Sequence, residues 1–150
     1  MSAKLADRNH PGTLIQTVKA FLEAKAYPGP SMIIAYAPCI AHGYDLCHGL
    51  EQQKAAVQSA YWPLFRYHPE WAAAGRNPFV LDSRTPSLPL DRFLYKEDRY
   101  SMLVQSAPET AALLLTEAQM DVDLRWKLYQ NWAQRGPVLQ TPELAEKQPG

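Results

Sequence analysis

Cys39 is the residue of this chain whose type and position most invite chemistry. It comes after a short apolar run at residues 32–36 and a proline, and it opens a loop that contains Gly43. A thiol at this place is well positioned to face a site, although no local signature marks it as a catalytic nucleophile. The plainer interpretation is a small buried side chain, because a lone free cysteine is usually packed inside a protein. Spacing alone favours this plainer interpretation.

A zinc site is an alternative, because cysteines and histidines fall close together here. Cys39 and His42 form a Cys-x2-His pair, and Cys47 is followed directly by His48. Adjacent residues rarely turn both side chains towards one ion, and this spacing matches none of the usual zinc patterns. The two cysteines of the chain also cannot supply the four thiolates of an iron–sulfur cluster. Any iron–sulfur role therefore needs ligands from elsewhere.

Other groups with chemical potential are weaker candidates. An aromatic-rich stretch could stack nucleic-acid bases, but in a neutral chain it favours an aromatic core; its members are Trp62, Phe65, Tyr67 and Trp71. Gly43 and Gly49 do not form a phosphate loop, since no Gly-Lys-Ser or Gly-Lys-Thr follows. His68 is interpreted as a packing or surface residue. Two carboxylate pairs are interpreted as solvated helix faces: Glu97 with Asp98, and Asp121 with Asp123.

The composition limits the class of protein. The chain has 150 residues, of which 15 are basic and 15 acidic, so its net charge is zero. This argues against a general nucleic-acid binder, which gains affinity by neutralising phosphates. A content of 47% hydrophobic and 20% charged residues is typical of one folded domain. No apolar stretch approaches the roughly 20 residues of a membrane span. The polar start shows no secretory signal, so we expect a cytoplasmic protein with free thiols and no membrane contact.

The elements that must position Cys39 predict half of an α/β unit. A capping box at Thr13 and Gln16 predicts the start of a helix that ends near residue 25. The predicted buried face of this helix is apolar: Leu14, Val18, Phe21 and Leu22. After a Pro-Gly-Pro turn, the run at residues 32–36 lacks alternation, which predicts a strand buried on both faces. Ligands of open α/β sheets sit beyond the carboxyl ends of the strands, where Cys39 falls.

The rest of the chain predicts more helices and two short strands. Helices are expected at residues 50–60, 92–104 and 108–134, and strands at residues 64–67 and 77–82. The last helix has Ser106 as its predicted N-cap and Pro108 in its first turn. Its apolar residues are available for packing: Leu113, Leu114, Met120, Leu124 and Leu128. This predicts an α/β fold of few strands with flanking and C-terminal helices, divided into an irregular lead (1–12), a folded part (13–134) and a flexible tail (135–150).

Read as a string, the chain resembles a segment near the C-terminus of single-chain pyruvate:ferredoxin (flavodoxin) oxidoreductases. The resemblance is carried by residues 26–43 (AYPGPSMIIAYAPCIAHG), 61–67 (YWPLFRY) and 75–83 (GRNPFVLDS). Shorter matches are found at Gln52-Gln53-Lys54, Arg99-Tyr100, Ala118-Gln119-Met120-Asp121 and Arg125-Trp126. The resemblance covers about residues 14–134, in register.

The resemblance implies the last part of a thiamine-diphosphate-binding domain. Those enzymes cleave pyruvate on thiamine diphosphate and Mg²⁺, form acetyl-CoA, and pass electrons through 4Fe-4S clusters to ferredoxin or flavodoxin. In the family, a cysteine at the position of Cys39 is the distant fourth ligand of the cluster nearest the thiamine diphosphate. Cys47 matches no ligand position and is left as a free thiol.

The departures from the family imply that this sequence does not act alone. It lacks the upstream cluster cysteines, the segment that binds Mg²⁺ and the diphosphate, the glutamate that activates the cofactor, and the ferredoxin-like domain. Residues 1–12 do not follow the family. We therefore expect a fragment that is inactive without the rest of the oxidoreductase, binds no cofactor by itself, and presents an exposed apolar face. The alternative is a non-catalytic interaction module or a genetic remnant.

Overall fold

The computed structural model describes residues 2–3, 11–37 and 39–136, with side chains from residue 15 onward. Helix α1 (Pro11–Ala26) begins before the predicted capping box, so Thr13 lies inside its first turn and the cap prediction is wrong. The end of α1 agrees with the prediction, since Pro28-Gly29-Pro30 follows. The predicted lead contains a short strand, β1 (Ser2–Ala3), and the first residues of α1. The predicted tail lies outside the described residues, apart from Arg135 and Gly136.

The described strands form two separate pairs. β1 runs parallel to β2 (Ile34–Ala35), with Ser2 opposite Ile34. β3 (Phe65–Tyr67) and β4 (Phe79–Leu81) form an antiparallel hairpin in which Arg66 lies opposite Val80. Helix α3 (Glu70–Ala73), which was not predicted, lies in the connection between them. Short strands with flanking helices confirm the predicted α/β class.

The prediction of a doubly buried strand at residues 32–36 is wrong. The strand is only two residues long, Ile34 is 50% exposed, and Met32 is 72% exposed. Its apolar character therefore reflects a surface that the described residues do not cover. Among the described elements, β1 alone pairs with β2.

The middle of the chain is helical but broken more often than predicted. Two 3₁₀ turns, η1 (Ile40–His42) and η2 (Leu46–His48), precede helix α2 (Gly49–Gln58). The predicted helix at residues 92–104 is two helices, α4 (Asp91–Leu94) and α5 (Asp98–Ser106), because Glu97 adopts an extended backbone between them. Within α2, Ala55 and Ala56 are buried, whereas Leu50 is 48% exposed.

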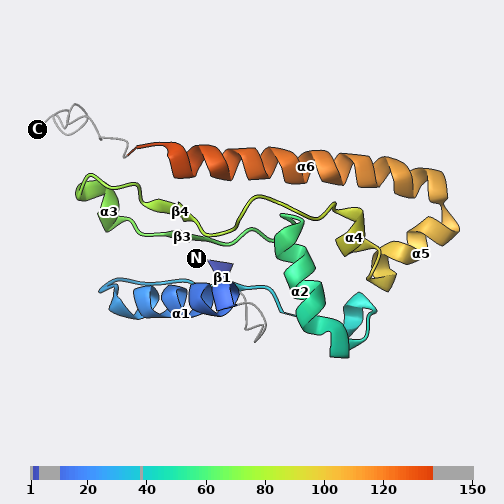
Figure 1. Cartoon of the computed structure of the whole chain (residues 1–150), viewed down its shortest axis with the longest axis horizontal. Coiled ribbons are helices and arrows are strands. Elements are labelled where there is room, and N and C mark those ends of the chain that lie inside the picture. Colours follow the sequence, from blue (N-terminus) through green and yellow to red (C-terminus); the bar gives the residue numbers. More distant parts are fainter. Residues whose placement is uncertain (1, 4–10, 38, 137–150) are drawn as a thin grey trace, which may run out of the picture.

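Helix α6 (Pro108–Gln134) has 27 residues and spans about 40 Å. Its predicted extent is confirmed, but Ala107 is the N-cap, and the Ser106 hydroxyl donates instead to the Met102 carbonyl at 3.0 Å. In Figure 1, α6 forms one long side of the molecule, the β3–β4 hairpin lies beneath it, and α1 lies on the far side of the hairpin. No helix within the described part of the chain is long and apolar enough to cross a membrane.

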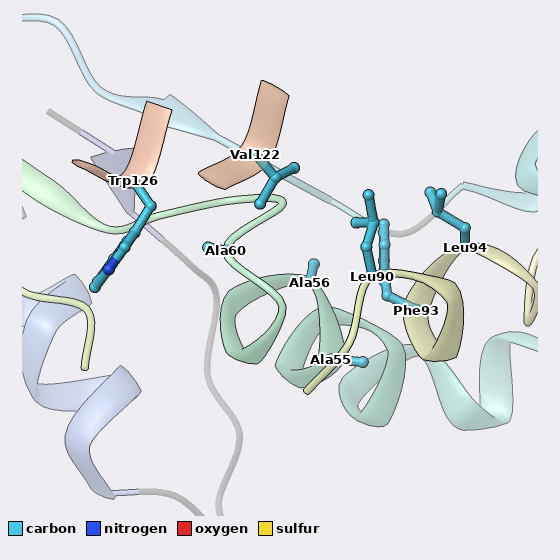
Figure 2. Packing of buried hydrophobic residues seen from close by; sticks show 8 residues of the cluster. All are labelled: Ala55, Ala56, Ala60, Leu90, Phe93, Leu94, Val122 and Trp126. Carbon is cyan, nitrogen blue, oxygen red and sulfur yellow. The ribbon is translucent and has the colours of Figure 1, made fainter. Parts of the chain in front are cut away.

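The core lies where α2, α4 and α6 meet (Figure 2). Phe93 is fully buried in this core, and its ring lies 4.5 Å from that of Tyr61. Two alanines of α2 let this helix approach closely, and a third alanine follows the helix. The members of the cluster are Ala55, Ala56, Ala60, Leu90, Phe93, Leu94, Val122 and Trp126.

A polar network fastens α1 to the β3–β4 hairpin. Arg66 is 8% exposed; its Nε and Nη2 donate to Asp82 Oδ2 and Oδ1 at 2.8 and 2.9 Å. Its Nη1 also donates to Glu23 of α1, and Gln16 Nε2 donates to Asp82 Oδ2 at 3.2 Å. The face of α1 that packs on the rest of the protein is therefore formed by three buried residues, Gln16, Thr17 and Ala20.

Candidate functional site

The Cys39 thiol is exposed, which contradicts the plainer interpretation of a buried cysteine. It lies in the loop that follows β2, as predicted, immediately before the η1 turn. The η1 turn is closed by two backbone hydrogen bonds, from His42 N to Cys39 O at 3.1 Å and from Gly43 N to Ile40 O at 3.0 Å. We call residues 36–37 and 39–43 the Cys39 loop.

Gly43 ends the Cys39 loop in a conformation that favours glycine. Its φ is +71°, and a Cβ built on it would lie 2.5 Å from the Cβ of Asp98. The Gly43 carbonyl accepts a hydrogen bond from the Asp98 amide at 2.8 Å. The start of α5 therefore approaches the end of the loop closely, with no space for a side chain.

The other end of the loop is held by α2. Gln53 is 2% exposed, and its Nε2 donates to the Tyr36 carbonyl at 3.3 Å. The Tyr36 ring packs against Trp62, with ring centroids 5.3 Å apart, and stacks on His42 at 6.1 Å. Tyr36 and His42, each three residues from Cys39, are thus packed on the protein, while Cys39 itself is exposed.

Glu97 is fully buried beside the loop, so its interpretation as part of a solvated face is wrong. Its Oε1 accepts from Gln52 Nε2 at 2.9 Å, and its Oε2 accepts from Arg99 Nε at 2.6 Å. The same Gln52 nitrogen also donates to the Phe93 carbonyl at 3.0 Å. His42 Nδ1 lies 3.9 Å from Glu97 Oε1. No sequence pattern marks Glu97 as buried, because its neighbours are charged.

Three tyrosines near the Glu97 carboxylate have raised pKa values. Burial, and then the negative charge of Glu97, raise the pKa of Tyr36 well above its ordinary value. The pKa of Tyr44 is raised by the same two causes in the same order. Burial and a 3.4 Å hydrogen bond with Tyr61 raise the pKa of Tyr100 to about 12. These phenols therefore stay neutral at physiological pH; Tyr100 bonds Tyr61 through its hydroxyl, and Tyr36 packs through its ring.

Cys47 is also exposed, but its surroundings differ from those of Cys39. Asp45 caps the η2 turn by accepting from the Cys47 amide at 2.9 Å. A hydrogen bond and the negative charge of Asp45 raise the pKa of the Cys47 thiol. Cys47 is therefore protonated over a wider pH range than an ordinary cysteine, which makes it a weaker nucleophile and ligand.

The alternative sites are not assembled in the described part of the chain. No group of three or more His, Cys, Asp or Glu side chains lies close enough there to hold a metal ion. Nor do the aromatic residues form one platform: Trp62 packs on Tyr36, whereas Phe65 stacks on Phe79 at 5.3 Å. His68 is a packing residue, stacked on Trp71 at 5.1 Å.

Two helices turn apolar side chains outward, contrary to prediction. On α1, Val18, Phe21 and Leu22 are 48%, 55% and 60% exposed. On α6, Val122 is buried but Leu124 is 62% exposed, since two positions correspond to about 200° around a helix. The α6 residues predicted to pack are exposed: Leu113, Leu114, Met120, Leu124 and Leu128. We call these the outer faces of α1 and α6.

More exposed apolar side chains lie in the segments around Cys39. Ile34 precedes the Cys39 loop, Ile40 lies inside it and is 77% exposed, and Leu46 follows it. Isolated exposed apolar residues are common on protein surfaces. Cys39 thus has exposed apolar side chains both before and after it along the chain.

Comparison with known proteins gives this geometry a context. No family model matches the chain. The pyruvate-flavodoxin oxidoreductase of Trichormus variabilis is 56% identical over 119 residues, which are 79% of this chain and 10% of that protein. This chain is similar to a segment of pyruvate-flavodoxin oxidoreductases.

Further relatives extend the comparison to proteins with other names. The pyruvate:ferredoxin oxidoreductase of Moorella thermoacetica is 44% identical over 119 residues, again 79% of this chain and 10% of that protein. The mitochondrial pyruvate dehydrogenase [NADP(+)] of Euglena gracilis is 39% identical over 120 residues, or 7% of its length. The chain thus spans about a tenth or less of the length of these curated relatives.

Proposed function

We propose that this chain supplies one segment of a pyruvate:ferredoxin or pyruvate:flavodoxin oxidoreductase. Residues 13–134 would form the end of its thiamine-diphosphate-binding domain, and Cys39 would be one ligand of the 4Fe-4S cluster nearest that cofactor. The observation that carries the proposal is 56% identity over 119 residues to one such enzyme. The remaining segments are required, in the same polypeptide or in a separate one.

The names of the relatives favour a role for this segment in the chemistry of pyruvate, which they share, rather than in the choice of the electron acceptor. Similar segments occur in proteins named for flavodoxin, ferredoxin and NADP⁺, and pyruvate is common to all three names. A segment that selected the acceptor would not be expected to keep 39–56% identity across these names. A position next to the pyruvate-handling centre accounts for this constancy.

The residues present fit one ligand of a shared cluster. A 4Fe-4S cluster takes four protein thiolates, and this sequence has two cysteines, one of which has its pKa raised by Asp45. Cys39 is exposed and is followed by the exposed Ile40, so a second protein surface could close over a cluster there. A bound cluster would supply one-electron transfer, while this chain would fix its ligand and help to exclude water.

The outer faces of α1 and α6 support incorporation into a larger protein. Phe21, Leu22 and Leu124 are each more than half exposed, and burying what remains exposed would contribute about 1–2 kcal/mol apiece. The polar network around Arg66 holds α1 in this orientation, with its apolar side outward. We infer that other segments of the oxidoreductase cover these faces.

Complementation tests the proposal. The matched segment is removed from the Trichormus variabilis enzyme, and this chain is co-expressed with the remainder. We expect a brown complex that reduces flavodoxin with pyruvate, because the chain restores the missing surface and ligand. The variant Cys39→Ala should assemble but lose pyruvate-dependent reduction, whereas the matched control Cys47→Ala should retain it.

Two results would refute the proposal in different ways. Failure of the wild-type chain to bind the remainder would exclude the structural role. Full activity of the Cys39→Ala complex would exclude the ligand role and favour the alternative of a non-catalytic module. The two variants differ only in which exposed thiol is removed, so general effects of cysteine loss cancel.

A further inference from the structure

The Cys39 loop is held at both ends by groups from other elements: the buried Gln53 side chain at one end, and the backbone amide next to the buried Glu97 at the other. On its N-terminal side, Gln53 of α2 donates to the Tyr36 carbonyl. On its C-terminal side, Asp98 donates its amide to the Gly43 carbonyl, and Glu97 faces His42. The exposed Cys39 thus lies between two hydrogen-bonded backbone carbonyls, those of Tyr36 and Gly43, although Cys39 itself is open to solvent.

The burial of these polar side chains costs free energy and therefore needs an explanation. Gln52 and Gln53 are each 2% exposed and Glu97 is fully buried, in a chain whose apolar side chains are extensively exposed. Burying a carboxylate is costly unless hydrogen bonds compensate it. Gln52 and Arg99 provide those hydrogen bonds, and Gln52 also fastens the network to α4 through the Phe93 carbonyl. Both oxygens of the Glu97 carboxylate accept a hydrogen bond, and a buried group held in this way fixes the geometry of its neighbours.

We propose that Gln53 and Glu97 are positioning residues that hold the two ends of the Cys39 loop and so present the thiol at a fixed place. This inference deepens the proposed function, and it rests on that function for the role of the thiol as a cluster ligand. A ligand held rigidly by groups outside the first coordination sphere costs less to order when a metal centre forms. The restriction of the Cys39 loop by Gln53 and Glu97 can be measured in this chain alone.

Glu97 has two routes to the loop. Its backbone leads directly to Asp98, whose amide bonds the Gly43 carbonyl, so fixing the Glu97 carboxylate also fixes that donor. Its side chain faces His42, the last residue of η1, whose imidazole is held on the other side by the Tyr36 ring. Gln53 fixes the carbonyl of the same Tyr36. The two positioning residues therefore act on one continuous set of contacts.

A spin label on Cys39 tests the inference in the full chain. The label is placed on Cys39 in a Cys47→Ala background, and on Cys47 in a Cys39→Ala background as an internal control. We expect Gln53→Leu and Glu97→Gln each to narrow the spectrum of the Cys39 label, because the loop moves more freely. The Cys47 label should not change. Gln105→Leu and Glu117→Gln, the same substitutions at exposed sites, should leave both labels unchanged.

Hydrogen exchange provides a second readout that a general loss of stability would not imitate. The amides of His42, Gly43 and Asp98 should exchange about tenfold faster in Glu97→Gln, since a charge-assisted hydrogen bond is replaced by a weaker neutral one. Amides of the β3–β4 hairpin should be unchanged. An unaltered Cys39 label in both variants would overturn the inference, as would a uniform rise in exchange along the chain. Neither measurement depends on whether the complementation experiment succeeds.

Discussion

Phe93 lies in the small core and Phe21 on the outer face of α1. Replacing each by alanine therefore compares how much the two regions contribute to the stability of the chain. Phe93 is fully buried and packs on Tyr61, whereas Phe21 is 55% exposed on α1. Truncation of a core phenylalanine to alanine costs about 3–5 kcal/mol. In a chain of this length, each kcal/mol corresponds to about 2–4 °C in Tm. We therefore expect Phe93→Ala to lower Tm by about 6–20 °C.

Phe21→Ala should have a much smaller effect on the isolated chain. Because more than half of the side chain is already in contact with water, the expected cost is below about 1 kcal/mol, or less than about 4 °C in Tm. Urea unfolding followed by tryptophan fluorescence, at several protein concentrations, checks both variants. Equal losses for Phe21→Ala and Phe93→Ala, independent of concentration, would show that the outer face of α1 is packed within the chain and would refute this account.

Two further predictions concern the loops around the cysteines. Gly43→Ala should destabilise the chain by about 1–3 kcal/mol more than Gly75→Ala in urea unfolding; both glycines have positive φ, but only at Gly43 does the added Cβ meet Asp98. Asp45→Asn should move the pH profile of Cys47 alkylation to lower pH, because Asp45 raises the pKa of that thiol and its removal favours the thiolate. An unchanged Cys47 profile, with that of Cys39 as reference, would exclude this electrostatic effect.

The positions of the main elements could be predicted from local sequence signals. The Pro-Gly-Pro turn ends α1, and Pro108 begins α6, because proline fits the first turn of a helix and disrupts its interior. The two strands of the hairpin were also predicted within a few residues. These signals depend on the backbone alone and do not require knowledge of what surrounds an element.

The orientation of the elements could not be predicted in the same way. An apolar helix face indicates that something covers it, but not whether the cover belongs to the same segment. Val18 and Leu124 were therefore expected inside and are exposed, while Gln16 is buried in their place. The buried position of Glu97 also escaped prediction, because a carboxylate surrounded by charged neighbours is usually solvated and only the tertiary contact with Gln52 reveals the exception.

The two apolar sides of α6 have a consequence for the amount of this segment that persists in a cell. A helix that is covered on one side only is stabilised further by whatever occupies the other side, in proportion to its concentration and affinity. If the remaining segments of the proposed oxidoreductase form a separate polypeptide, the steady-state level of this chain should rise and fall with their supply, and surplus copies should be degraded first.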